Sequence, residues 1–151
     1  MTERVGFSEA LRVMKDLGVV LLPGLSEEQV CDEEARLGCL FDAELREWFG
    51  ASAGFGVDDY SMGGIRLWPV GEFTRMHSLP GGLGTDPAIP PRFIVLADYL
   101  AYSHFYGFFC RKKRVATAPV FCFFRGKSWE VAGSFREFLN ALCTDPDRLL
   151  L

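Results

Sequence analysis

The chain has 151 residues, of which 49% are hydrophobic and 24% are charged, a composition that suffices for one well-packed core but not for two. It excludes long disordered stretches, because the apolar residues can bury enough surface to offset the entropy of ordering. The formal net charge of −4 is uneven: residues 1–60 hold 13 acidic and 5 basic side chains, and residues 61–151 hold 7 and 11. An acidic first half disfavours phosphate backbones there and favours a basic partner, although solvated helix faces explain it equally well.

The start of the chain does not have the pattern of an export signal. Residues 1–15 interleave charged with apolar side chains, and the longest apolar run near the start, 19–22, ends at Pro23. That run is far shorter than the roughly 20 residues of a membrane-spanning helix. We therefore expect a cytoplasmic protein without membrane contact.

The first predicted helix covers 7–17. Ser8 is its expected N-cap, and Gly18 can end it in the left-handed conformation. Its apolar face consists of three residues at helical spacing: Leu11, Met14 and Leu17. Residues 19–22 follow as a short extended segment.

Two further helices are predicted before residue 52. Ser26 and Gln29 form a capping box that starts a helix ending at Gly38. One face of this helix is acidic and consists of Glu27, Glu28, Asp32, Glu33 and Glu34. Asp42 is the expected N-cap of the next helix, whose apolar face is made by Leu45, Trp48 and Phe49.

From Gly63 onward the hydrophobic period becomes that of strands. Strands are predicted over 65–70, 93–97, 105–110, 120–124 and 129–131. The second of them is apolar at every position, which indicates a central strand covered on both faces. A Gly/Pro-rich loop over 79–91 precedes it.

The last predicted element is a helix that begins with a second capping box, Ser134 with Glu137. Its apolar face consists of Phe135, Phe138, Leu139 and Leu142. Together these elements predict one α+β domain over 1–151. We expect a mixed, mostly antiparallel sheet of about five or six strands, with N-terminal helices and a C-terminal helix packed on it.

Five segments carry a family resemblance: Glu33–Gly38, Glu44–Phe49, Ile65–Phe73, Phe93–Tyr99 and Ala132–Leu139. They comprise an acidic helix ending in Leu-Gly, an aromatic helix, two strands and a closing small-x-Ser-Phe-x-x-Phe-Leu segment. In order and spacing they resemble the SUKH superfamily, which includes bacterial toxin-immunity proteins and a fungal regulator of cell-wall synthesis. The resemblance is strongest over 25–145.

The resemblance implies a domain that binds proteins and catalyses nothing. We expect a bacterial immunity protein that neutralises a cognate toxin, such as a nuclease or deaminase with a basic cleft, by covering its active site. A regulatory scaffold of the same superfamily is the alternative, and a small enzyme or a nucleic-acid binder fits less well. No catalytic residue, cofactor or metal ion is expected.

A protein-binding surface needs anchors such as Tyr beside polar side chains. The chain offers two clusters with this mixture, one around residue 59 and one around residue 98. Glu72 is a further acidic residue between them in the sequence. The predicted partner-binding residues are Asp58, Asp59, Tyr60, Glu72, Asp98, Tyr99, Tyr102 and His104. The acids among them would replace the phosphates of a toxin's substrate and steer association. Core packing explains the aromatic residues at least equally well.

Other residues with chemical potential favour structural roles. His104 and Cys110 lie too far apart along one strand for proton transfer, and Cys122 lies in an apolar strand. The five cysteines form an odd set without zinc-ligand spacing, so they are expected to be reduced thiols. The glycines of 81–84 lack the Lys-Ser/Thr of a phosphate-binding loop. The basic run 111–114 is expected to be a solvated hairpin tip in preference to a phosphate contact.

Overall fold

The computed structural model describes residues 7–79 and 92–150 and has the α+β architecture expected from the sequence. Its helices are α1 (Phe7–Asp16), α2 (Glu27–Leu37), α3 (Ala43–Ala51) and α4 (Phe135–Thr144). Its strands are β1 (Ile65–Leu67), β2 (Thr74–Arg75), β3 (Phe93–Tyr99), β4 (His104–Phe109), β5 (Val120–Phe124) and β6 (Lys127–Ala132). Three short 3-10 helices are also present: η1 (Val70–Glu72), η2 (Met76–Ser78) and η3 (Pro146–Leu150).

The strands form a single sheet in the order β1-β3-β4-β5-β6, with β2 also paired to β3. All pairs among the described strands are antiparallel, where the sequence predicted a mixed, mostly antiparallel sheet. Strand β3 is the central element, because it pairs with β1, β2 and β4. Six of its seven residues are buried, which confirms the prediction of a strand covered on both faces.

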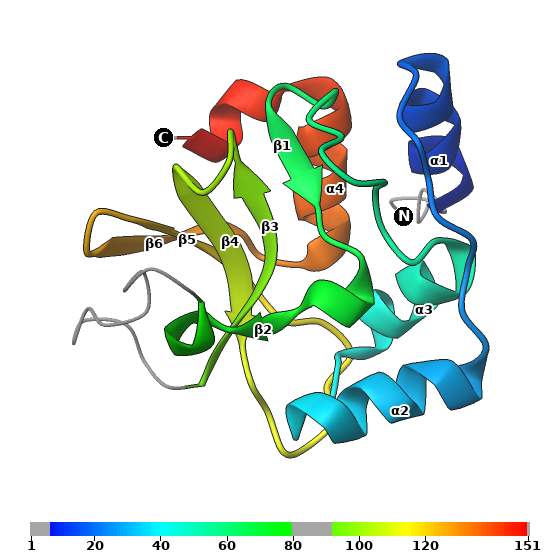
Figure 1. The fold of residues 1–151 in the computed structure, drawn as a ribbon, viewed down its shortest axis with the longest axis vertical. Coiled ribbons are helices and arrows are strands. Elements are labelled where there is room, and N and C mark those ends of the chain that lie inside the picture. Colours follow the sequence, from blue (N-terminus) through cyan, green and yellow to red (C-terminus); the bar gives the residue numbers. More distant parts are fainter. Residues whose placement is uncertain (1–6, 80–91, 151) are drawn as a thin grey trace, which may run out of the picture.

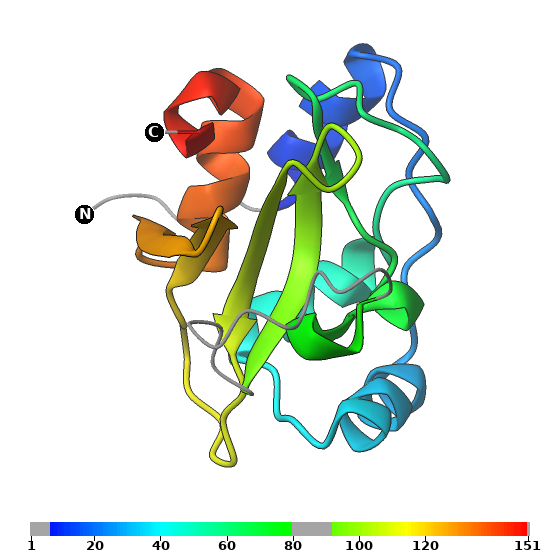
Figure 2. The same cartoon turned by 60° about the vertical axis from the view of Figure 1, so that its left-hand side comes forward.

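The helices and the sheet share an aromatic core. Phe138 of α4 packs on Tyr106 of β4, with 5.4 Å between ring centroids. Phe7, Trp48 and Phe135 bring α1, α3 and α4 together at centroid distances of 5.7–6.5 Å. Figures 1 and 2 show α1 and α4 at the same end of the molecule as the β3–β4 turn, and α2 at the other end.

Helix α2 begins as predicted. The Ser26 hydroxyl accepts from the Gln29 N–H at 3.2 Å, and the Gln29 side chain accepts from the Ser26 N–H at 2.9 Å. At the other end Gly38 takes the left-handed conformation with φ 64°. The second predicted box is only half right: Ser134 caps α4, but the Glu137 carboxylate accepts from the Gly133 N–H.

Three other sequence predictions were wrong in detail. Ser8 lies inside α1 and is not its N-cap. Leu17 is 57% exposed, because α1 ends one residue earlier, at Asp16. The buried residues of α1 are Phe7 and Met14. Strand β1 ends at Leu67, before Pro69 and the 3-10 turn of η1. The predicted loop over 79–91 lies outside the described residues from position 80 onward.

The N-cap of α3 predicts a pH-dependent contribution to stability. Asp42 is buried and accepts from the Leu45 N–H at 2.9 Å. Burial raises the pKa of its carboxyl group to about 6, although the Leu45 hydrogen bond opposes this. The native protein therefore holds this proton more tightly than the unfolded chain does. The resulting stabilisation is complete below about pH 4 and is lost as the pH rises through about 6.

Because asparagine also caps helices but does not titrate, Asp42→Asn removes this dependence. We expect the free energy of unfolding of the variant, minus that of the wild type, to rise by about 2–3 kcal/mol between pH 4 and pH 7. Urea titrations at a series of pH values measure the difference. A difference that stays constant with pH would contradict the assignment.

Candidate protein-binding surface

Asp98 is a buried carboxylate that joins three segments of the chain. It has no exposed surface and lies on β3. One oxygen accepts from the Tyr60 hydroxyl at 2.9 Å and from the Tyr102 N–H at 2.8 Å, and the other accepts from the indole N–H of Trp68 at 2.6 Å. Hydrogen bonds to a charged acceptor are stronger than neutral ones, so Asp98 fixes the segments around Tyr60 and Tyr102 relative to the sheet.

Tyr60 is held in its protonated, donating form. Burial and the hydrogen bond to Asp98 raise the pKa of its hydroxyl to about 12. At neutral pH the phenol is therefore a permanent donor to Asp98. This hydrogen bond ties residues 38 positions apart in the sequence.

The turn between β3 and β4 has a strained backbone. Leu100, Ala101 and Tyr102 follow one another with φ of 41°, 55° and 76°, a region that residues other than glycine adopt at a cost. The turn is closed by the Ser103 N–H, which donates to the Tyr99 carbonyl at 2.9 Å. The Leu100 N–H donates to the Gly64 carbonyl at 3.0 Å and so joins the turn to the segment before β1.

The strained turn presents two apolar side chains to solvent. Leu100 is 54% exposed and Tyr102 is 48% exposed. The Tyr102 ring stacks on Phe105 with centroids 5.6 Å apart, and it makes a T-shaped contact with Trp68 at a centroid distance of 6.0 Å. These contacts fix the ring before any partner arrives, which lowers the entropic cost of using it as an anchor.

The segment 56–64 forms the neighbouring part of this surface. Asp59 accepts from the Val20 N–H at 2.6 Å and from both the N–H and the hydroxyl of Ser61. Partial burial alone would raise the pKa of Asp59, but these hydrogen bonds outweigh it and the pKa lies below its ordinary value. The Gly56 N–H donates to the Val20 carbonyl at 2.8 Å, so the segment after α1 is joined to the same loop.

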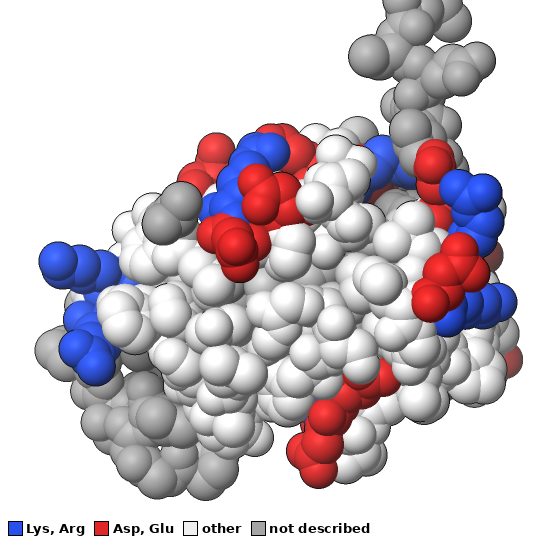
Figure 3. All heavy atoms as spheres, turned by 90° about the horizontal axis from the view of Figure 1, so that it is seen from above, with Lys and Arg blue, Asp and Glu red and all other residues white. Residues whose placement is uncertain are grey.

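Three segments meet here: the one that follows α1, the segment 56–64 and the β3–β4 turn. They contain the five large hydrophobic side chains that are exposed among the described residues: Leu17, Val20, Val57, Leu100 and Tyr102. We call them, with the exposed Asp58, the apical surface. Its segments lie at the upper end of the molecule in Figure 1. Seen from that end, the molecule is largely uncharged, and acidic and basic side chains gather around the edge (Figure 3). The Gly56–Val20 and Leu100–Gly64 hydrogen bonds join these segments, and grouped exposed apolar side chains are typical of interaction sites.

Two predicted acids support the surface through the residues that they bind. Asp98 was expected to face a partner, but it is fully buried with both oxygens engaged, so it cannot contact one directly. Glu72 pairs with Arg66 at 3.1 Å, and buried Arg66 donates to the Gly56 carbonyl at 3.0 Å. Glu72 therefore braces the loop through Arg66, while its half-exposed carboxylate remains accessible.

Tyr99 and His104 lie side by side under the turn. The His104 ring stacks on Phe124 with centroids 4.2 Å apart, and it makes a T-shaped contact with Tyr99 at a centroid distance of 5.3 Å. Burial lowers the pKa of His104, which favours a neutral imidazole. Because His104 and Phe105 are adjacent on β4, they face opposite sides of the sheet, and only Phe105 contacts Tyr102.

The basic run 111–114 is not simply a solvated tip. Arg114 pairs with the buried Glu34 of α2 at 2.9 Å and donates to the Phe41 carbonyl at 3.1 Å. Glu34 also pairs with Arg46 of α3. Arg114 thus joins the β4–β5 connection to the helices. Fewer cations of the run remain free to contact a phosphate backbone.

All five cysteines are free thiols, as the sequence predicted. Cys39 and Cys122 are buried, and burial raises the pKa of both thiols to about 12. A thiol with such a pKa is protonated at neutral pH and is a poor nucleophile. These two residues therefore pack as small hydrophobic side chains.

Across residues 7–79 and 92–150 there is no group of three or more His, Cys, Asp or Glu side chains arranged to hold a metal ion. In the same residues, no helix combines the length and apolar character needed to cross a bilayer. Comparison with protein-family models finds no match, and comparison with curated proteins finds none that is significant.

Proposed function

We propose that this domain binds a protein partner through the apical surface and carries out no reaction, acting as an immunity-type inhibitor that covers the active site of a cognate toxin. The proposal includes SUKH membership and a cytoplasmic location. The observation that carries it is the strained turn that exposes Leu100 and Tyr102 and is held in place by the hydrogen bond between Asp98 and the Tyr102 N–H. A strained turn that displays Leu100 and Tyr102 to water costs stability, and contacts with a partner would offset that cost.

Two features of the surface suit an enzyme with a basic cleft. Tyr102 is a rigid aromatic anchor of the kind that dominates binding energy in protein interfaces. Asp58 is exposed beside Val57, which is 82% exposed. An acid next to an apolar contact would steer a cationic cleft toward the surface and increase the association rate.

The buried polar groups have structural roles and lack the properties of catalytic groups, which favours a binding function. Asp98 is committed to three donors, so it has no free oxygen with which to accept a substrate proton. The raised pKa of Cys122 keeps its thiol protonated. These groups stabilise the fold that presents the surface.

The test is co-expression with the product of the adjacent gene. The proposal expects that product to be toxic alone, harmless together with this domain, and recovered in a 1:1 complex by affinity purification. If no neighbouring product binds and none is toxic in the absence of the domain, the proposed function is wrong.

Tyr102→Ala is expected to weaken that complex by about 10-fold or more, because a central aromatic anchor typically contributes 2 kcal/mol or more, roughly 30-fold. Isothermal titration calorimetry with the purified partner measures the change. Lys113→Ala, in the β4–β5 connection at the opposite end of the molecule, is the control and should leave the affinity unchanged. Equal affinities for Tyr102→Ala and the control would remove the apical surface from the interface.

A further inference from the structure

A second candidate contact lies away from the apical surface, in a groove between α2 and η1. Its volume is about 280 Å³, just under the range of pockets for drug-sized ligands, so its size suits a single long side chain better. One part of the lining is apolar: Leu25, Ala53, Pro69 and Val70. The α2 wall is polar: Gln29, Asp32 and Glu33.

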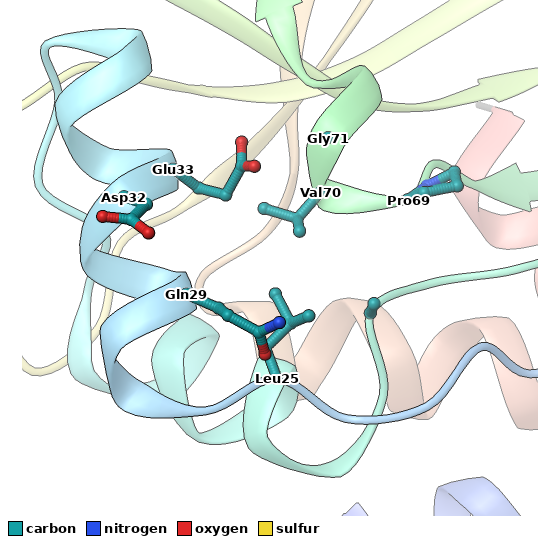
Figure 4. Close-up of a pocket in the computed structure, with 8 residues that line it drawn as sticks. Leu25, Gln29, Asp32, Glu33, Pro69, Val70 and Gly71 are labelled. Carbon is teal, nitrogen blue, oxygen red and sulfur yellow. The ribbon is translucent and has the colours of Figure 1, made fainter.

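The groove combines an apolar floor with an acidic wall. In Figure 4, Gln29 and Glu33 extend from α2 toward Leu25 and Val70, and Asp32 lies nearer the outside of the helix. Asp32 is exposed and makes no hydrogen bond or ion pair with any residue of 7–79 or 92–150. Its charge is therefore available to a ligand.

The chain itself shows that this wall accepts a guanidinium. Arg36 donates from Nε to the Glu33 carboxylate at 2.7 Å and from Nη2 to the Val70 carbonyl at 3.0 Å. These two acceptors belong to residues on opposite sides of the groove. Arg36 therefore occupies these two acceptors, which shows that a guanidinium fits between α2 and η1, and a second cation would have to use the neighbouring Asp32 carboxylate.

We propose that the groove binds an arginine or lysine side chain of a partner polypeptide. The aliphatic stem would lie on Leu25 and Val70, and the cationic head would reach Asp32 beside the Arg36–Glu33 pair. This inference rests on the proposed protein-binding function for its natural ligand. Charge complementarity selects this occupant. Helix α2 carries five acidic side chains and one basic one, Arg36, and two of the acids, Glu28 and Asp32, have no ion pair among the described residues, so the wall keeps a negative charge.

The experiment uses the isolated domain, labelled with ¹⁵N, and two blocked tripeptides. Acetyl-Ala-Arg-Ala-amide is the probe, and the same peptide with citrulline in place of arginine has the same stem without the charge. At an ionic strength of about 20 mM, the arginine peptide should cause saturable amide shifts centred on Gln29, Asp32, Val70 and Gly71, with a dissociation constant in the millimolar range. The citrulline peptide should cause none.

Two Asp-to-Asn variants separate the groove from general charge effects. Asp32→Asn should raise the dissociation constant of the arginine peptide about threefold to fivefold, as expected for the loss of one partly exposed ion pair. Asp16→Asn makes the same change in net charge on α1 and should leave the dissociation constant unchanged. Equal binding of the two peptides, equal effects of the two variants, or shifts centred elsewhere would each overturn the proposal.

The two proposals fail in different ways. A domain that binds a neighbouring toxin but shows no shifts with the arginine peptide retains the proposed function and loses the groove. A domain that binds the arginine peptide in the groove but has no toxin partner retains the groove and loses the immunity role.

Discussion

Asp98→Ala is expected to lower the free energy of unfolding by about 3–5 kcal/mol, because it leaves donors without acceptors inside the protein. The Trp68 indole N–H and the Tyr102 N–H both lose a charged acceptor, and the Tyr60 hydroxyl loses its partner. The strained turn also loses the hydrogen bond that fixes Tyr102. Urea denaturation followed by tryptophan fluorescence measures the loss.

Asp58→Asn is the matched control for that experiment. Asp58 is exposed and has a φ of 55°, a conformation that asparagine tolerates as well as aspartate does. Its effect should stay within about 0.5 kcal/mol. If Asp98→Ala lowers the free energy of unfolding no more than the control does, the Asp98 carboxylate does not hold the apical surface in place.

The second large effect is expected for Glu34→Ala, at about 3–5 kcal/mol. Glu34 is buried, pairs with Arg46 and Arg114, and accepts from the Phe41 N–H at 2.8 Å. Its removal leaves two cations facing each other and a buried N–H without an acceptor, and breaking a buried ion pair from one side costs far more than breaking an exposed one. The same urea titration measures the change.

Glu33→Ala is the neighbouring control on the same helix. Glu33 makes a more exposed pair with Arg36 three residues away, so its loss should cost no more than about 0.5 kcal/mol. The Glu34 effect should also persist at 1 M salt, where exposed pairs are screened. Similar losses for the two variants, or a Glu34 effect abolished by salt, would contradict a buried network.

Local chemistry explains which elements could be predicted from sequence. The Ser26–Gln29 box and the Asp42 cap depend on residues three positions apart, and both form as expected. The apolar segment 93–97 became the central strand because only a fully covered strand suits it. Ser8 was misplaced because a possible N-cap inside an amphipathic pattern has the same local signature as a true one.

The candidate site was predictable in composition but not in arrangement. Tyr60, Asp98 and Tyr102 were all named, and the Tyr60 hydroxyl and the Tyr102 N–H both donate to Asp98. Their roles differ, because the burial of Asp98 depends on Trp68, which reaches it from 30 residues away. No sequence period reports such a contact.

Four exposed residues of the surface, Leu17, Val20, Val57 and Leu100, were missed for a related reason. Val20 and Leu17 are apolar residue types that usually lie in a core. Leu100 belongs to a turn whose positive-φ positions contain no glycine, so the sequence does not indicate a turn there. Their exposure follows from where α1 ends and from hydrogen bonds between distant segments. The signal that would have helped is the row of bulky residues without Gly or Asn in a tight hairpin, since strain of that kind gathers at functional sites.

Hydrogen–deuterium exchange of this domain, free and in complex with the adjacent gene product, shows which segments the partner covers. If the partner binds the apical surface, exchange slows at 57–60 and 100–103 in the complex and stays unchanged in β6. Protection confined to β6 or to the β4–β5 connection, with the apical segments exchanging as fast as in the free domain, would contradict binding at that surface.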